Sequence, residues 1–563
     1  MEYLIFVVFA VAVVLLILLK GYIDFKREEK KFIKSLYENY GNESMKEVKP
    51  ERLLNIPLYF DKHQKDFVID DITFNDLNLL SFFLEMNTTY SSAGEEYLYY
   101  LLRTPVFEEE ELKRRDEIIN YFSEHPGERV RSQFLFQKLG NTGKYSIYNY
   151  LEFLDDLGER NNFRHYLALV AVLLAGIMIF VDLPIGLVLL VCVFVWNIMS
   201  YFKFKAEVDP YITSFSYINR MLSVTGKLLE IKMPVLTDEW KELAACNQCM
   251  GHYKRGNFLL MSPTRMTASG NPLDIFLDYL RMVFHLDLLQ FNKMLRAVRQ
   301  QKEQIDRMIT ILGETEALIA VGGYRNKKKA YWIPHLPDLR EISAKELYHP
   351  LLENPVKNDI SVAKSVLITG SNASGKSTFL KTLALNQILA QTIYTVFADD
   401  YQTFFSRVCT SMALRDDLEG GDSYYMVEIK ALKRIMSMVG TIGAPVFCFV
   451  DEVLRGTNTV ERIAASTQIL KSLNAGNCMC FAATHDMELT HLLEAEFENY
   501  HFKEEIEGND ISFSYKLLSG RAQSRNAIKL LGIMGYDEDM IDAAEKLATE
   551  FMRTGKWGIG LDE

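Results

Sequence analysis

Two stretches of the chain are strongly apolar and stand apart from the mixed pattern elsewhere. The first runs without a charge from Leu4 to Leu19 and ends at Lys20. With its flanking residues it reaches roughly the 20 residues that a helix needs to cross a bilayer. Its only preceding charge is Glu2, and a cluster of lysine and arginine follows, which is the reverse of a cleavable signal peptide. We therefore predict an uncleaved anchor whose N-terminus lies outside the cytoplasm.

The second apolar stretch runs from Tyr166 to Phe202 and is interrupted only between Asp182 and Pro184. Proline fixes φ and lacks an N–H, so this interruption predicts a tight turn between two helices. Basic residues precede and follow the stretch. Because basic loops stay in the cytoplasm, we expect a transmembrane hairpin with both ends on that side. A buried hairpin in a soluble core is the alternative interpretation.

The spacing of apolar residues outside these stretches is helical up to about residue 320. Phe74 to Leu102 follows this spacing, and Met282 to Leu312 predicts one long amphipathic helix. Basic side chains lie along the second segment. We interpret them as a solvated helix face, with a DNA-facing stripe as the alternative. They are Arg296, Arg299, Lys302 and Arg307. The basic turn from Arg325 to Lys329 is either a phosphate-binding cluster or a solvated loop tip.

Beyond about residue 360, short β-rich runs alternate with helical stretches. The runs are Ser365–Thr369, Val446–Val450 and Met479–Ala483. This alternation predicts a mostly parallel sheet covered by helices. The fold class that we predict is therefore α/β plus all-α, with about three transmembrane helices.

Composition narrows the classes of function. The 563 residues are too many for one ordinary domain, and 49% hydrophobic with 24% charged residues excludes a disordered chain. The net charge of −12 argues against a wholly basic nucleic-acid binder. Seven cysteines without a paired framework argue against a disulfide-stapled secreted protein. Cys246, Cys249 and His252 resemble half of a zinc site, but no second C-x-x-C pair accompanies them, so we assign no zinc.

A phosphate-binding loop is predicted between Gly370 and Ser377. The segment reads G-S-N-A-S-G-K-S and matches G-x-x-x-x-G-K-[ST]. It follows a strand-like run and opens a helix-like one, so its N–H groups and the helix N-terminus would bind phosphate. We expect Lys376 to reach the β- and γ-phosphates and Ser377 to bind Mg²⁺.

A second motif agrees with the first. The apolar run from Val446 ends in two carboxylates, Asp451 and Glu452. Asp451 suits Mg²⁺, and Glu452 suits the general base that polarises the attacking water. A segment with Ser423 precedes these carboxylates, and His485 ends the next strand-like run. This order is that of ABC-type ATPases, whose sites are completed when two subunits enclose ATP.

The sequences of these motifs resemble those of the MutS mismatch-recognition family over about residues 345 to 545. The resembling segments are Tyr348–Leu352, Ile368–Thr378, Arg415–Glu428, Asp451–Thr459 and Ala483–Thr490. A weaker resemblance to the helical core domain of that family covers Ile72–Leu79, Thr88–Gly94, Leu101–Pro105 and Arg114–Ile118. The resemblance implies a C-terminal ABC-type P-loop ATPase domain on a helical MutS-like core, with the hairpin inserted into that core.

The resemblance also implies roles for single residues. ATP and Mg²⁺ would be held by the loop residues Gly370, Ser371, Asn372, Ala373, Ser374, Gly375, Lys376, Ser377 and Thr378. Glu452, His485 and Lys376 would form the catalytic group, in which His485 senses the γ-phosphate. Ser423 would reach the nucleotide of a partner subunit. Tyr515 would lie near the adenine, with a core aromatic as the alternative.

Departures from the family pattern leave open whether the chain turns over ATP efficiently. Ser371, Ala373 and Ser374 stand where the family usually has Pro, Met and Gly, and Asn458 stands where Ser is usual. The core pattern begins near Asp70, which leaves about fifty residues after the anchor. That is too few for the N-terminal domain with which the family reads mismatches, so we expect that domain to be absent.

Six segments are predicted. They are an N-terminal transmembrane anchor (1–23), the first part of the helical core (24–160), a transmembrane hairpin (161–204), the second part of the core with lever-like helices (205–343), the ATPase domain (344–535) and a C-terminal helical dimerisation segment (536–563).

The function expected from the sequence is that of a multi-pass cell-membrane protein with a cytoplasmic MutS-like ATPase. A homodimer would hydrolyse ATP at composite sites and couple hydrolysis to mismatched or otherwise structured DNA, a partner implied by the family. The alternative is a nucleotide-gated membrane scaffold that binds a protein partner, whose identity the sequence does not indicate. A third hypothesis, an ABC-type machine for a lipid or small solute, would have few membrane helices.

Overall fold

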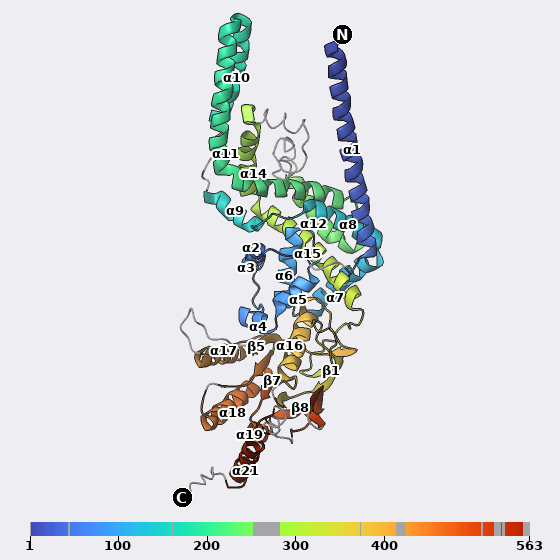
Figure 1. Cartoon of the computed structure of the whole chain (residues 1–563), viewed down its shortest axis with the longest axis vertical. Helices are drawn as coiled ribbons and strands as arrows, with labels where there is room; N and C mark the ends of the chain where they lie inside the picture. The colour runs from blue at the N-terminus through green and yellow to red at the C-terminus, as the bar shows by residue number, and fades with distance from the viewer. Residues whose placement is uncertain are drawn as a thin grey trace. The chain divides into compact units, whose positions relative to one another are not determined.

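The computed structural model describes residues 2–42, 46–156, 158, 161–250, 282–371, 373–412, 424–455, 457–507, 510–522, 528, 531 and 535–554. By its contacts the chain divides into two compact units. The helical unit comprises Met1–Gln64, Phe83–Leu101 and Arg114–Lys327, and the sheet unit comprises Lys65–Phe82, Leu102–Lys113 and Lys328–Glu563. Figure 1 shows the helices and strands of both units.

Helices make up the chain before the first strand. In chain order they are α1 (Glu2–Glu38), α2 (Pro50–Leu53), α3 (Leu58–Lys62), α4 (Asp71–Asp76), α5 (Leu79–Met86), α6 (Ser92–Arg103), α7 (Glu109–Glu124), α8 (Pro126–Leu139), α9 (Ile147–Asp156), α10 (Phe163–Val181), α11 (Leu183–Leu228), η1 (Pro234–Leu236), α12 (Thr237–Cys249), α14 (Leu286–Gln300) and α15 (Lys302–Lys328).

The apolar hairpin is formed by α10 and α11 of the helical unit. Asp182 caps α11 by accepting the N–H of Ile185 at 3.1 Å, which makes it the turn residue between the two helices. A Cβ at Gly186 would lie 2.4 Å from the backbone nitrogen of Ile179, so the helices approach too closely here for any larger residue. The predicted pair of helices joined by a tight turn is therefore present.

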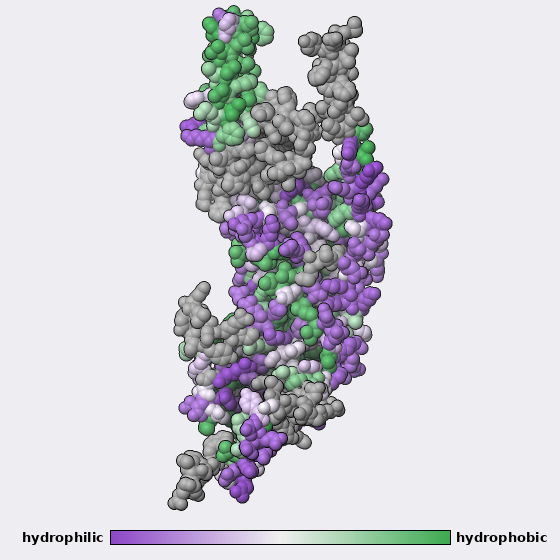
Figure 2. All heavy atoms as spheres, in the orientation of Figure 1, coloured by the Kyte–Doolittle hydropathy of each residue, from purple (hydrophilic) through white to green (hydrophobic). Residues whose placement is uncertain are grey.

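Both helices of the hairpin are long and apolar enough to cross a membrane, over Phe163–Val181 and Leu183–Phe204. Only 17% and 11% of their most apolar windows are buried, whereas a core helix of a soluble protein is mostly buried. Figure 2 shows the hydrophobic surface that results. The remaining predicted span, Leu4–Leu19, lies within the continuous helix α1, and its crossing stays a prediction.

The predicted long helix from Met282 to Leu312 is broken in the structure. A turn at Gln301, with φ of −129°, separates α14 from α15, and α15 continues to Lys328. The apolar spacing continues across the turn, so periodicity alone could not detect it. From Ile305 onward most of α15 is buried, which makes it the central helix of this unit.

Basic residues that the sequence left open to a phosphate-binding role are paired within the protein. Arg307 contacts Glu242 through two nitrogens at 2.6 and 2.7 Å. Arg325 is buried and donates to Asp116 at 2.6 Å. Lys327 lies 3.0 Å from Glu85. The structure therefore gives these side chains structural partners.

The sheet unit contains two sheets. The strands are β1 (Ile342–Leu347), β2 (Asn358–Val362), β3 (Ser365–Thr369), β4 (Asp400–Gln402), β5 (Arg407–Ser411), β6 (Val446–Asp451), β7 (Cys478–Thr484), β8 (Phe497–Glu507) and β9 (Asp510–Ser519). Three strands form an antiparallel sheet in the order β2-β1-β4, and six form the main sheet in the order β5-β6-β7-β3-β8-β9. Four of the five pairings in the main sheet are parallel, and only β8 with β9 is antiparallel.

The mostly parallel sheet that the sequence predicts is confirmed. Strands β3, β5, β6 and β7 are buried along their whole length, as expected when both faces of a parallel sheet are covered. The helices of this region are α16 (Lys376–Thr392), α17 (Tyr424–Val439), α18 (Thr459–Ala475), α19 (Met487–Leu492) and α21 (Glu538–Thr554). Because β6, β7 and β3 are parallel neighbours, the loops after them meet at one edge.

Candidate active site

The phosphate loop joins β3 to α16 at the carboxyl edge of the main sheet. Gly370, Ala373 and Gly375 have φ of 149°, 64° and 108°, in the region that glycine adopts most readily. A Cβ at Gly375 would also come within 3.2 Å of the ring of Tyr515. The loop therefore needs glycine at this position both for its backbone conformation and for space.

Lys376 begins α16 and turns back over the loop. Its Nζ donates to the carbonyl oxygens of Gly370 at 2.9 Å and Ser371 at 2.8 Å, and lies 3.4 Å from Nε2 of His485. Burial lowers the pKa of Lys376, although nearby carboxylates oppose the effect. The ammonium group is thus desolvated and held at the loop, where a phosphate group would be neutralised.

Ser377 and Asp451 form the pair expected to bind Mg²⁺. The Ser377 hydroxyl donates to Oδ2 of Asp451 at 2.6 Å, and Oδ1 of Asp451 is buried without a hydrogen-bond partner. A buried carboxylate oxygen without a donor favours a cation. Hydroxyl and carboxylate oxygens are also the ligands that Mg²⁺ prefers. The two residues therefore fit the metal.

Glu452 lies directly after β6 in a left-handed conformation, with φ of 56°. Its Oε1 is 2.7 Å from Nε2 of His485, and its Oε2 is 2.5 Å from Nε of Arg455. Burial favours the neutral acid, but the hydrogen bond with His485 and the charge of Arg455 outweigh it and lower the pKa of Glu452. The carboxylate is consequently kept ionised, as a base must be.

Two adjoining cavities lie around these side chains. One, of about 360 Å³, is lined by the phosphate loop together with Glu452, Arg455 and Tyr515. The other, of about 230 Å³, is mostly apolar and shares Gly375, Thr378 and Tyr515 with the first. A polar cavity beside an apolar one suits a molecule with a phosphate end and a planar hydrophobic end.

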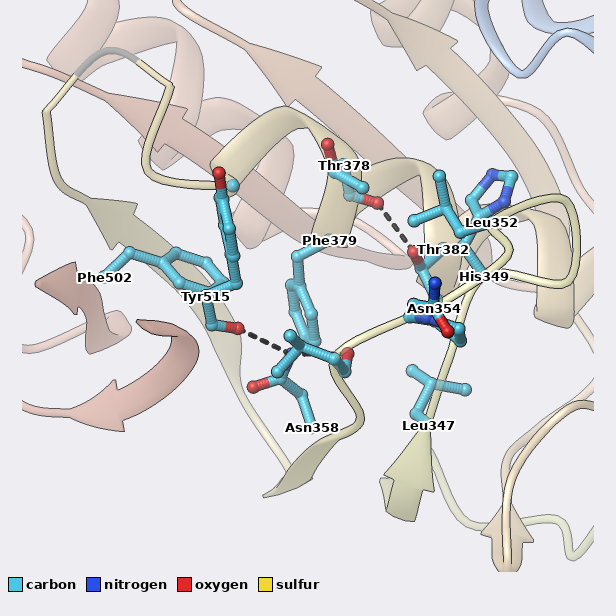
Figure 3. Close-up of a pocket in the computed structure, with 13 residues that line it drawn as sticks. Leu347, His349, Leu352, Asn354, Asn358, Thr378, Phe379, Thr382, Phe502 and Tyr515 are labelled. Atoms are coloured by element: carbon cyan, nitrogen blue, oxygen red, sulfur yellow. Dashed lines mark hydrogen bonds between the residues drawn. The ribbon is translucent and has the colours of Figure 1, made fainter. Parts of the chain in front are cut away.

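The apolar cavity is bordered by aromatic rings. Figure 3 shows Tyr515, Phe502 and Phe379 on one side and His349 on the other. Tyr515 is 44% exposed, and its carbonyl accepts the side-chain N–H of Asn358 at 3.0 Å. A ring in a cavity wall with this exposure is not a core aromatic, and its stacking on adenine stays a prediction.

The structure brings Lys376, Ser377, Asp451, Glu452 and His485 together, although they come from three separate motifs. Ser371 also lies in the loop, and its hydroxyl donates to Glu504 at 2.9 Å. Ser374 is buried there, and Thr378 lines both cavities. Two predicted site residues, Asn372 and Ser423, lie outside the described residues.

Sequence reasoning missed the contact of Arg455 with Glu452 and that of Glu504 with Ser371. Arg455 was visible in its motif, but no sequence pattern shows where its side chain points. Glu504 is far from Ser371 in the sequence and became a neighbour only through the parallel pairing of β3 with β8. No zinc was assigned at Cys246 and Cys249, and the described residues contain no group of three metal-binding side chains.

Comparisons with known proteins give the same family for this part of the chain. The family model described as MutS domain V matches residues 366–552. The DNA mismatch repair protein MutS of a Thermus thermophilus strain is 29% identical over 254 residues, 44% of this chain and 31% of that protein. MutS protein homolog 4 of Homo sapiens is 27% identical over 295 residues, 49% of this chain and 31% of that protein.

A third relative, the DNA mismatch repair protein MutS of Thermotoga petrophila, is 33% identical over 209 residues, which is 35% of this chain and 26% of that protein. The chain thus covers about a third or less of the length of these three relatives. The similarity therefore concerns one part of each relative and does not carry over the activity of the whole protein.

The wall position of Tyr515 leads to a prediction about nucleotide affinity. Tyr515→Ala should weaken ATP binding about two- to twelvefold, because a lost aromatic stack costs roughly 0.5–1.5 kcal/mol. Tyr515→Phe should keep the affinity, and Tyr536→Ala, at an exposed tyrosine that lines neither cavity, is the control. Binding is measured with a fluorescent ATP analogue. A loss of thermal stability without a change in affinity would show that Tyr515 only packs.

Proposed function

The chain belongs to the MutS family by its C-terminal ATPase domain, and from this premise we propose that it is a membrane-anchored, MutS-like ATPase. The observation that carries the proposal is the cluster at the edge of the main sheet. There the Ser377 hydroxyl lies 2.6 Å from Asp451. His485 lies 2.7 Å from Glu452 and 3.4 Å from Lys376. This is the set of groups that phosphoryl transfer to water requires.

The proposed reaction is hydrolysis of ATP at its γ-phosphate. Lys376 and the loop N–H groups bind the β- and γ-phosphates, and bound Mg²⁺ would neutralise charge on them. Glu452 orients a water molecule and accepts its proton as the water oxygen bonds to the γ-phosphorus. The bond from that phosphorus to the oxygen of ADP breaks. His485 contacts both Glu452 and Lys376, and the family resemblance assigns it to sense the γ-phosphate.

A homodimer is proposed as the unit that hydrolyses ATP. The family resemblance assigns Ser423 to the nucleotide of the partner subunit, which makes the site composite. Helix α21 is amphipathic and exposes Met540, Leu547 and Phe551 at spacings of seven and four residues, along one stripe. An exposed apolar stripe of this kind supports a subunit contact at the C-terminus.

A membrane location is proposed from α10 and α11, with α1 as a further span. Lysine and arginine follow the apolar part of α1 and flank the hairpin. By the positive-inside rule this distribution supports a cytoplasmic ATPase domain and an N-terminus outside. The exposure of most apolar side chains on the hairpin supports lipid contact over burial in a soluble core.

DNA is proposed as the partner that ATP hydrolysis controls, because two of the relatives are named DNA mismatch repair proteins. A nucleotide-gated scaffold for a protein partner is the second candidate. The observation that favours it is the pairing of Arg307 with Glu242 and of Arg325 with Asp116, which uses cations that a DNA surface would need.

The role of Glu452 predicts a separation of binding from turnover. Glu452→Gln should keep ATP affinity within about twofold and slow phosphate release at least about a hundredfold, because the amide cannot accept the proton. Glu461→Gln, at an exposed glutamate of α18, is the control and should hydrolyse ATP at the wild-type rate. Unchanged turnover in Glu452→Gln would contradict the assigned base.

The membrane proposal predicts the accessibility of two cysteines that the structure exposes, Cys192 in the hairpin and Cys249 at the end of α12. In a Cys246→Ser background, a charged maleimide added to inside-out vesicles should label Cys249 and leave Cys192 unlabelled until the protein is unfolded in detergent. Equal labelling of both cysteines in intact vesicles would contradict a membrane-embedded hairpin.

The two candidate partners are separated by a DNA-binding measurement on the full chain in lipid nanodiscs. If DNA is the partner, mismatched or branched duplexes should bind at low salt, respond to ATP and lose affinity as salt rises. Homoduplex DNA serves as the control substrate. An absence of DNA affinity at low salt, with and without ATP, would reject the DNA role and favour the scaffold.

A further inference from the structure

The loop from Asp451 to Arg455 carries both carboxylates of the proposed ATPase site and is held by hydrogen bonds from three elements. The N–H of Glu452 donates to Ala483 of β7 at 2.9 Å. The carbonyl of Val453 accepts the hydroxyl of Ser466, in α18, at 3.1 Å. The N–H of Leu454 donates to Oε1 of Glu428, in α17, at 2.5 Å. The last contact is made by a charged side chain, which sets it apart from the other two.

Glu428 lies in an unusual environment for a carboxylate. It is 2% exposed, and its second oxygen, Oε2, is buried without a hydrogen-bond partner. Burial raises the pKa of Glu428, and the N–H groups of Leu454 and Arg455 only partly offset the effect. An apolar side chain would fill the same space at lower cost. The carboxylate therefore does more than fill space. Its Oε1 accepts the N–H of Leu454 in the loop.

The backbone that Glu428 contacts is strained. Glu452 and Leu454 have φ of 56° and 60°, a region that is unfavourable for a residue with a side chain. Such conformations persist where the surroundings determine them. Leu454 is also buried in the core beneath α17 and α18, so its side chain and its N–H are both fixed. The bond to Glu428 is thus one of the polar contacts that keep this turn in place, and it is the one that acts on Leu454 directly.

The turn determines where Arg455 points. Its Nε lies 2.5 Å from Oε2 of Glu452, and Nη2 lies 3.7 Å from Oδ2 of Asp451. Arg455 is one of the charges that keep the Glu452 carboxylate ionised. Because Leu454 directly precedes Arg455, a change of φ and ψ at Leu454 would turn the arginine away from Glu452.

We propose that Glu428 is a positioning residue which, through the N–H of Leu454, fixes the turn that directs Arg455 onto Glu452. Helix α17 begins at Tyr424, the residue after Ser423. Glu428 therefore connects the helix next to the proposed partner-contacting serine with the carboxylate that activates water. The inference rests on the proposed ATPase activity and adds to it a route by which α17 controls the base.

The test uses Glu428→Ala in the full chain and measures kcat and KM for ATP hydrolysis. We expect kcat to fall about tenfold while KM for ATP stays within about twofold, because the phosphate loop is untouched. The loss in kcat is expected because an arginine turned away from Glu452 no longer holds that carboxylate in place for the water molecule.

Arg455→Gln supplies the reference for this loss. It should lower kcat in the same way, and the double variant Glu428→Ala/Arg455→Gln should lower kcat no further than Arg455→Gln alone, because both changes remove one contact. Ser466→Ala is the matched control, since it removes a hydrogen bond to the same loop from α18. It should keep kcat within about twofold of wild type.

Glu428→Gln covers the case in which the alanine variant does not fold. The amide keeps an acceptor oxygen for the Leu454 N–H, so kcat should stay within about threefold of wild type.

The inference is overturned if Glu428→Ala leaves kcat unchanged, or if the losses in kcat of Glu428→Ala and Arg455→Gln multiply in the double variant. A wild-type protein without Glu452-dependent hydrolysis would instead overturn the proposed function, so the two failures are distinguishable.

Discussion

Charge compensation at the carboxyl edge of the main sheet is the constraint on which the site depends. Parallel pairing of β6, β7 and β3 places two carboxylates, a histidine and a lysine-bearing loop side by side. Groups of this kind are costly to bury unless they are paired. The structure pairs Ser377 with Asp451 at 2.6 Å, and both His485 and Arg455 with Glu452. The same contacts orient the side chains, so stability of the edge and geometry of the site have one cause.

Much of the sheet and the site could be predicted because each prediction used residues close together in the sequence. The run Ser365–Thr369 is β3 residue for residue, and the loop and the carboxylates follow buried strands. In contrast, the contacts of Glu428 with Leu454 and of Ser371 with Glu504 join residues 26 and 133 positions apart. No local pattern encodes such pairs, because they depend on how strands and helices pack.

The apolar helices show the same limit, because the exposed hairpin could be predicted from the sequence and the burial of α15 could not. The hairpin of α10 and α11 was predictable, since an uncharged apolar run of this length is rare in soluble proteins. Helix α15 reads as amphipathic, yet it is buried from Ile305 onward and carries Glu316 in its interior. That carboxylate is satisfied by the backbone N–H groups of Tyr90 and Ser91, 226 and 225 residues away. Its burial raises the pKa of Glu316 to about 7.

The continuity of α11 determines how the hairpin relates to the rest of the helical unit. The helix has 46 residues from Leu183 to Leu228, and only its first half, to Phe204, is apolar enough to cross a membrane. At 1.5 Å per residue it extends about 70 Å without a break. The second half buries Phe215, Ile218 and Met221 in the unit and contacts α8, α12 and α14. One helix therefore carries both the apolar half of the hairpin and a half that packs in the core, so the hairpin is joined to the core without a loop.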